Sequence, residues 1–134
     1  MRRVLASALL GGLLWATTAA SAPTAALGPQ LRGPATVTPG QMVGFRAHGF
    51  RSGSLLEVLL VPVDKPSCCA VRIASSFPVS SRGDASLTFR MPRYYRRCLA
   101  VGHCRKVHWS GRESVAVTAF GYLQEATTRT SVAP

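Results

Sequence analysis

Residues 85–91 read ASLTFRM, and apolar and polar side chains alternate strictly along this stretch. In an extended chain the four apolar residues share one face: Ala85, Leu87, Phe89 and Met91. The polar residues between them share the other face: Ser86, Thr88 and Arg90. A period of two is typical of a β-strand with one face buried and one in water. The stretch therefore predicts a half-buried strand and indicates the fold class of the sequence around it.

Similar short segments lie on both sides of this strand. We expect strands at residues 35–38, 41–48, 55–63, 114–120 and 124–132, and one broken strand over 70–74 and 77–81. Turn residues separate them, including Pro39-Gly40 and the tripeptide Arg82-Gly83-Asp84. No segment shows the helical period. The pattern predicts an all-β domain, a seven-stranded immunoglobulin-like β-sandwich.

The N-terminus has the plan of a secretory signal peptide. Arg2 and Arg3 precede an apolar run over residues 4–16, and small residues follow as far as Ala22. This run is shorter than the roughly 20 apolar residues that span a bilayer, so an uncleaved anchor is the less favoured alternative. Residues 23–34 lack a hydrophobic period and predict a flexible leader. We therefore expect a signal peptide at 1–22, a leader at 23–34, a domain at 35–134, and a secreted, extracellular protein.

The chain is strongly basic, with 16 Lys and Arg against 5 Asp and Glu and a formal net charge of +11. Only Arg2 and Arg3 lie in the predicted signal, so the excess of positive charge belongs to the domain. A charge of this size favours acidic partners, such as cell-wall polymers, anionic lipid or nucleic acid. A basic surface that serves only solubility is the alternative.

A segment between residues 92 and 113 departs from the regular pattern and shows only a short strand signal near Val107 and Trp109. Long loops in compact domains are usually functional or disordered. Residues 90–112 carry cations, aromatic residues and no acid, and we take the following as candidate anion-binding residues: Arg90, Arg93, Tyr94, Tyr95, Arg96, Arg97, Arg105, Lys106, Trp109 and Arg112. Guanidinium groups with interleaved aromatics suit sugars, phosphates and single-stranded nucleic acid. A solvated basic loop is the alternative.

The four cysteines, Cys68, Cys69, Cys98 and Cys104, predict two disulfides in an exported protein. In an immunoglobulin-like sandwich the two loops that hold them emerge at the same end. We therefore expect Cys68 and Cys69 to pair with Cys98 and Cys104 across the loops. A local link between Cys98 and Cys104, with a vicinal pair or free thiols at 68 and 69, is the alternative.

Two other motifs, and the lack of a catalytic one, also bear on function. Cys98, His103, Cys104 and His108 have spacing that suits tetrahedral zinc, but oxidation of the thiols and the flanking cations argue against a metal, and we expect no cofactor. The Arg82-Gly83-Asp84 sequence is interpreted as turn chemistry rather than as an integrin ligand. No carboxylate lies near a histidine in the sequence, and general acid-base catalysis needs matched groups held together. We therefore expect no enzymatic activity.

The opening of the domain carries a resemblance to a known family. Val37-x-Pro39-Gly40-Gln41-x-Val43-x-Phe45, followed by Gly49-Phe50-x-x-Gly53, resembles secreted bacterial immunoglobulin-like sandwiches, including the apoprotein carriers of enediyne antibiotics. The resemblance covers about the first three strands. It implies a seven-stranded sandwich with two disulfides and, in the carriers, an aromatic chromophore held in a cleft. No binding residue is carried over from the family.

The predicted function is that of a secreted, non-enzymatic binding module whose basic, aromatic loop contacts an anionic polymer or a cell-surface component. The first alternative is a small-molecule carrier of the enediyne-apoprotein type, which predicts an apolar cleft between the sheets. The second is an envelope module that binds a protein partner. Oligomeric state cannot be inferred from the sequence.

Overall fold

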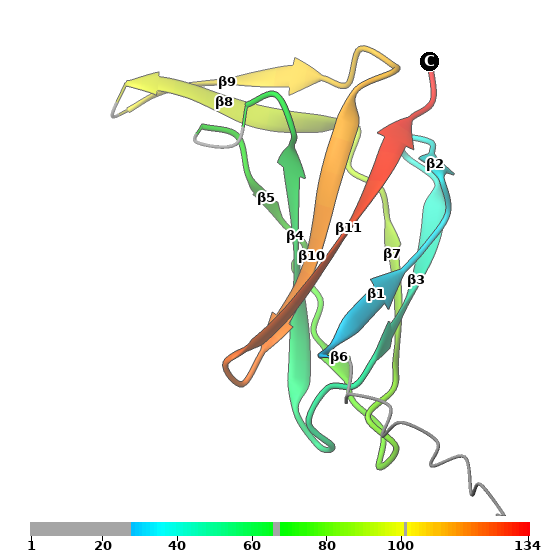
Figure 1. Cartoon of the computed structure of the whole chain (residues 1–134). Coiled ribbons are helices and arrows are strands. Elements are labelled where there is room, and N and C mark those ends of the chain that lie inside the picture. The colour runs from blue at the N-terminus through cyan, green and yellow to red at the C-terminus, as the bar shows by residue number, and fades with distance from the viewer. Residues whose placement is uncertain (1–27, 66–67, 101) are drawn as a thin grey trace, which may run out of the picture.

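A computed structural model describes residues 28–65, 68–100 and 102–134, and the predicted signal peptide lies outside these residues. All of the secondary structure in the described residues is β-strand, arranged in two sheets and a separate two-stranded hairpin (Figure 1). The all-β fold class is thereby confirmed. The described part of the chain contains no helix of the length and apolarity that crossing a membrane requires.

The smaller sheet has three strands in the order β1-β3-β7. They are β1 (Gln30–Arg32), β3 (Met42–His48) and β7 (Ala85–Arg90), all antiparallel to their neighbours. Burial alternates along β3 and β7 without interruption, as the sequence pattern predicts. One face of this sheet is therefore apolar and covered, and the other is polar and open to solvent.

The larger sheet has the order β2-β11-β10-β4-β5, with β6 also paired to β4. Its strands are β2 (Thr36–Val37), β4 (Leu55–Pro62), β5 (Val71–Arg72), β6 (Phe77–Pro78), β10 (Ser114–Gly121) and β11 (Gln124–Val132). Strand β2 runs parallel to β11, whereas the other pairs are antiparallel. The backbone N–H groups of Ser131 and Ala133 donate to the carbonyls of Ala35 and Val37 at 2.9 and 2.8 Å, which fixes β2 against β11.

The two sheets enclose one hydrophobic core. Phe45 and Phe89 of the smaller sheet stack with ring centroids 5.9 Å apart, and Phe77 of the larger sheet lies 6.4 Å from Phe89. Alternate residues of β4 and β10 complete the core, and they are fully buried: Leu56, Val58, Leu60, Val115, Val117 and Ala119. Side chains of the domain itself therefore fill the space between the sheets.

Residues 30–32, which the sequence predicts as part of the flexible leader, form strand β1. The reason is local: Leu31 is buried in the core, and β1 pairs with β3 from Gln30 opposite His48 to Arg32 opposite Arg46. A strand of three residues is too short to show a hydrophobic period. The immunoglobulin-like arrangement of seven strands stays a prediction, because the described residues form eleven strands in all.

The segment expected to be a long loop is instead the hairpin β8 (Tyr94–Ala100) and β9 (His103–His108). It forms a two-stranded sheet of its own. Figure 1 shows the hairpin extending sideways at the top of the sandwich, where β4 ends and β10 begins. The prediction of a loop was wrong because both faces of the distal hairpin are in water, so no apolar alternation marks its strands.

Candidate functional site

The hairpin places like charges directly opposite one another. Arg96 pairs with Lys106 and Arg97 pairs with Arg105 in the antiparallel register. All four side chains are exposed. Because side chains alternate along a strand, the first pair lies on one face of the hairpin and the second on the other. Like charges that are directly opposite destabilise a sheet, so the distal hairpin has a cationic surface that the strand pairing by itself does not favour.

Two aromatic side chains anchor the base of the hairpin in the core. Tyr95 and Trp109 are 1% and 8% exposed, and their ring centroids lie 4.6 Å apart. The indole Nε1–H of Trp109 donates to the carbonyl of Pro92 at 2.9 Å. The sequence singled out both residues as ligand-stacking aromatics, but their burial assigns them to positioning the hairpin.

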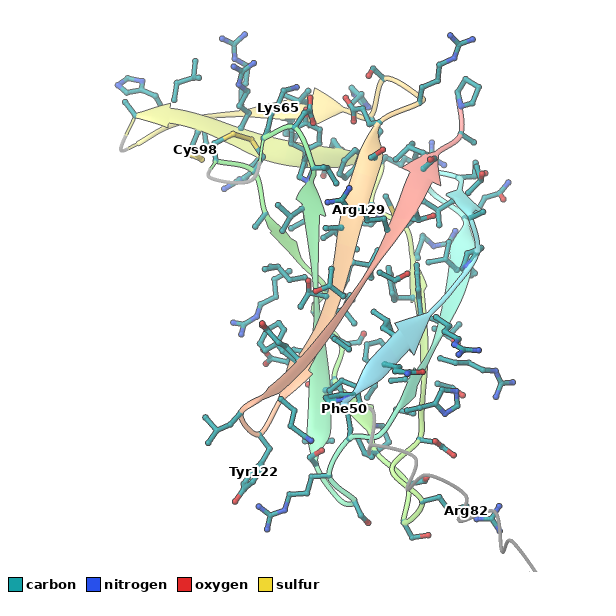
Figure 2. All side chains as sticks on the ribbon, in the orientation of Figure 1. Phe50, Lys65, Arg82, Cys98, Tyr122 and Arg129 are labelled. Carbon is teal, nitrogen blue, oxygen red and sulfur yellow. A yellow bond between two sulfur atoms is a disulfide. The ribbon has the colours of Figure 1, made fainter. Side chains whose placement is uncertain are left out.

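Lys65, in the turn after β4, ties the hairpin base to the larger sheet. Its Nζ donates to the hydroxyl of Tyr95 at 3.3 Å. This hydrogen bond, together with the charge interaction with the same residue, raises the pKa of Lys65 above its usual value of 10.5. Lys65 and Cys98 lie at the same end of the molecule in Figure 2.

Tyr94 is the one predicted aromatic of the hairpin that solvent reaches, with 39% of its surface exposed. The Lys106 ammonium lies 4.5 Å from its ring centroid, and the ring packs edge-on to His108 at 6.0 Å. A cation above one ring face is a favourable contact. Tyr94, Arg96 and Lys106 therefore share one face of the hairpin as an aromatic and cationic group.

The predicted pairing of cysteines across two loops is wrong. The disulfides join Cys98 to Cys104 and Cys68 to Cys69. Cys98 and Cys104 are direct cross-strand partners in the hairpin, 4.0 Å apart at Cα, so the nearest thiol for each is the other. The alternative of a local link was the correct one, and the adjacent pair then closes on itself.

The remaining candidate residues lie away from the distal hairpin. An Nη of Arg90 donates to the carbonyl of Gly40 at 2.6 Å, on the smaller sheet, and the Arg93 guanidinium packs beside the same glycine. Arg112 lies in the turn before β10 and has a positive φ of 63°. Of the ten candidates, the structure thus gathers five on the exposed hairpin, and they are Tyr94, Arg96, Arg97, Arg105 and Lys106.

The two remaining sequence motifs have structural explanations. Because Cys98 and Cys104 are joined to each other, they offer no thiolate to zinc, and the described residues contain no group of three or more side chains suited to a metal. Arg82, Gly83 and Asp84 form a turn, with Gly83 at φ 82° and its N–H donating to the carbonyl of Ser80. Asp84 accepts a hydrogen bond from His48 at 2.7 Å, provided that Nδ1 carries the proton.

Sequence reasoning missed an apolar strip on the outward face of the larger sheet. Val61 lies directly opposite Ala116, and Leu59 lies one row away between Thr118 and Arg72. These apolar side chains are only half-buried. Residues 55–63 are nearly all apolar, and this absence of polar alternation was the sequence signal of the strip.

No protein-family model matches the sequence. No curated protein matches it either. Among solved structures, the chain is similar to macromomycin, with a TM-score of 0.59 and 18% sequence identity over 79% of this chain and 100% of that one. At this identity the likeness concerns the fold alone.

Two further solved structures align over similar lengths. A superoxide reductase (neelaredoxin) from Ignicoccus hospitalis has a TM-score of 0.42 and 11% identity over 80% of both chains. The sulfur carrier protein SoxY from Chlorobium limicola f thiosulfatophilum has a TM-score of 0.36 and 15% identity over 79% of this chain and 77% of that one.

Proposed function

We propose that the protein is a secreted, non-enzymatic domain that carries a small apolar ligand on the outward face of its larger sheet. The fold similarity to macromomycin supports the resemblance to enediyne antibiotic carriers that the opening of the domain indicates. The disulfides are consistent with an oxidising, extracellular compartment. Because the core fills the space between the sheets, the ligand binds outside the sandwich rather than in the cleft between the sheets that the sequence suggested.

The observation that carries this proposal is the apolar strip of Leu59, Val61 and Ala116. A solvated face of an antiparallel sheet is normally polar, and the outward face of the smaller sheet follows that rule with Arg46, Ser86 and other polar residues. The strip departs from this rule. It lies on β4 and β10, which are inner strands of the larger sheet. Half-buried apolar side chains that adjoin on a solvated sheet face form a surface that a ligand can cover.

Charged groups border the strip on both sides. Arg129 is the direct neighbour of Ala116 on β11, and Arg72 is the direct neighbour of Leu59 on β5. Arg72 forms an ion pair with Glu57 and lies 5.7 Å from the ring of Phe120. A ligand with an apolar body and polar ends fits this arrangement, since its ends reach the guanidinium groups.

The test is a titration with N-phenyl-1-naphthylamine, an uncharged apolar probe that fluoresces when bound. We expect saturable binding by the parent protein and at least tenfold weaker binding by the double variant Leu59→Thr with Val61→Thr. The matched control is Leu99→Thr, which makes the same kind of change at an exposed leucine of the hairpin. Equal affinity in the parent and the double variant, with both folded by near-UV circular dichroism, would exclude the strip as the carrier site.

A second candidate function is the binding of an anionic polymer by the hairpin. It is favoured by the two like-charged pairs, Arg96 with Lys106 and Arg97 with Arg105, in a hairpin that contains no acidic residue. A polyanion that lies along either face places negative charge between paired cations and relieves their repulsion. Bidentate contacts from the arginines add to that gain.

Retention on heparin distinguishes this function from the effect of net charge. Arg96→Ala with Arg97→Ala removes two hairpin cations, and the matched control, Arg51→Ala with Arg82→Ala, removes two at the opposite end of the sandwich, where Figure 2 shows Arg82. We expect the hairpin variant to elute at clearly lower salt and to reduce the slope of log K against log salt by roughly one to two. Equal retention of the two variants would show that only net charge matters.

A further inference from the structure

We propose that a groove at the edge of the smaller sheet binds the phosphomonoester group of a small organic molecule through Arg32 and Arg46. The groove has a volume of about 580 Å³ and lies where the chain leaves β1 and crosses to β2 on the other sheet. In Figure 1, β1, β2 and β3 are on the right, whereas the hairpin extends to the left. The inference is therefore independent of the functions proposed above.

The first observation is an uncompensated pair of arginines. Arg32 and Arg46 are direct cross-strand partners in the antiparallel pair β1 and β3, and both are exposed. Side chains in such a pair lie on the same face with Cβ atoms about 5 Å apart. In the described part of the chain, the ion pairs join other residues, and neither Arg32 nor Arg46 takes part in one. Their repulsion thus lacks a compensating carboxylate in the described protein, and an anion between them would supply one.

The lining of the groove fits an ester better than a free ion. It contains no acidic residue, offers neutral polar side chains at Thr36, Thr38 and Gln41, and offers apolar ones at Val37 and Met42. A single oxyanion would leave most of the groove empty, since one water molecule takes about 30 Å³ in the liquid. A phosphate dianion matches two guanidinium groups in charge and in hydrogen-bonding geometry. Its organic substituent then occupies the remainder, against the threonines and the apolar residues.

The second observation is a glycine that lines the groove beside the arginine pair. Gly44 lies on the outward face of β3, two positions from Arg46, and a Cβ built on it would have no heavy atom within 4 Å. Its φ is not among the positive values of the chain, so the backbone does not require glycine here. A glycine inside a strand weakens the strand and often marks the close approach of a ligand. The missing side chain keeps the floor of the groove open beside Arg46.

Phenyl phosphate is the probe, titrated into the disulfide-bonded protein at low ionic strength and pH 7.5 by calorimetry. We expect saturable binding that weakens more than tenfold in Arg46→Gln. Gly44→Val should weaken it as much, because a branched side chain fills the open space and suits a strand. Arg82→Gln, which removes one positive charge from a distant turn, should leave the affinity unchanged.

Two related probes test the chemistry of the ligand. Phenyl sulfate carries one negative charge instead of two and should bind at least fivefold more weakly, and inorganic phosphate should also bind more weakly because it lacks the organic part. No saturable binding of phenyl phosphate, or equal weakening by Arg46→Gln and Arg82→Gln, would overturn the proposal. Inorganic phosphate binding as tightly as phenyl phosphate would overturn its organic part. If Arg46→Gln does not fold, Arg32→Gln provides the same test.

Discussion

Reversing one charge in the hairpin should make the protein more stable and at the same time weaken its binding to polyanions. In Arg97→Glu the repulsion between residue 97 and Arg105, its direct cross-strand partner, becomes an attraction. Cross-strand charge pairs contribute about 0.2 to 1 kcal/mol, and exposed pairs lie at the lower end of that range. Loss of repulsion and gain of attraction together should stabilise the domain by about 0.5 to 1 kcal/mol.

The assay is thermal unfolding at low and high salt. For a domain of roughly 100 residues, 1 kcal/mol corresponds to about 4 °C or somewhat more in Tm, so we expect Arg97→Glu to raise Tm by about 2 to 4 °C at low salt. In 1 M salt the Debye length is about 3 Å and the gain should largely disappear. Arg97→Gln removes only the repulsion and should give about half of the effect.

Amide hydrogen exchange in β8 and β9 provides a second readout, because a local gain in the hairpin slows exchange there even where global unfolding hardly responds. Arg82→Glu is the matched control, since it makes the same charge change in a turn at the opposite end of the molecule. A lower Tm for Arg97→Glu at low salt, or an equal gain in 1 M salt, would refute the argument from like-charge register. Stronger retention of this variant on heparin would refute the proposed polyanion surface.

Three further predictions concern other parts of the fold. Leu31→Ala should cost about 2 to 3 kcal/mol in urea unfolding because Leu31 is buried, whereas a change in a flexible leader would cost nothing. Tyr122→Asn with Leu123→Gly should raise Tm, because these residues have φ of 47° and 63° in a two-residue turn that favours Asn-Gly, and the left-handed conformation costs most other residues about 1 kcal/mol each. The parent should be more stable than Lys65→Met below the usual lysine pKa of 10.5, and this advantage should be lost as pH rises through the raised pKa of folded Lys65. A pH series of urea melts measures it. An advantage that grows above pH 10.5 would contradict this prediction.

The strands that border the core could be predicted from sequence because one face of each is buried. Residues 85–91 and 41–48 alternate in the sequence and in burial alike, and β7 and β3 lie within those bounds. Strand β1 has three residues, and its single buried side chain, Leu31, does not make a period. The hairpin strands escaped prediction because the residues distal to Tyr95 have water on both faces.

A different signal for the hairpin is present in the sequence. The order Arg96-Arg97-Cys98 before Gly102 is mirrored by Cys104-Arg105-Lys106 after it, and in the structure these residues are cross-strand partners. Gly102, one position after the centre of this mirror, has a positive φ of 84°, a conformation that glycine adopts readily in tight turns. The same mirror predicts the Cys98 to Cys104 disulfide, which an argument from the ends of a sandwich does not.

The candidate sites differ in how far sequence predicts them. Local charge density in the sequence draws attention to the cations of the hairpin, because they are close together in the chain. Arg32 and Arg46 are 14 positions apart and come together only through the register of β1 with β3. The strip of Leu59, Val61 and Ala116 likewise depends on which strands are neighbours in the larger sheet. Neither surface can be derived from composition or spacing.

The parallel contact of β2 with β11 gives the domain a mechanical property. These strands lie close to the first and last described residues, and they run in the same direction. A tensile force that reaches β2 and β11 from the two ends of the domain therefore pulls along the strands in opposite senses. It loads the hydrogen bonds of Ser131 and Ala133 in shear, so that they must break together rather than one after another.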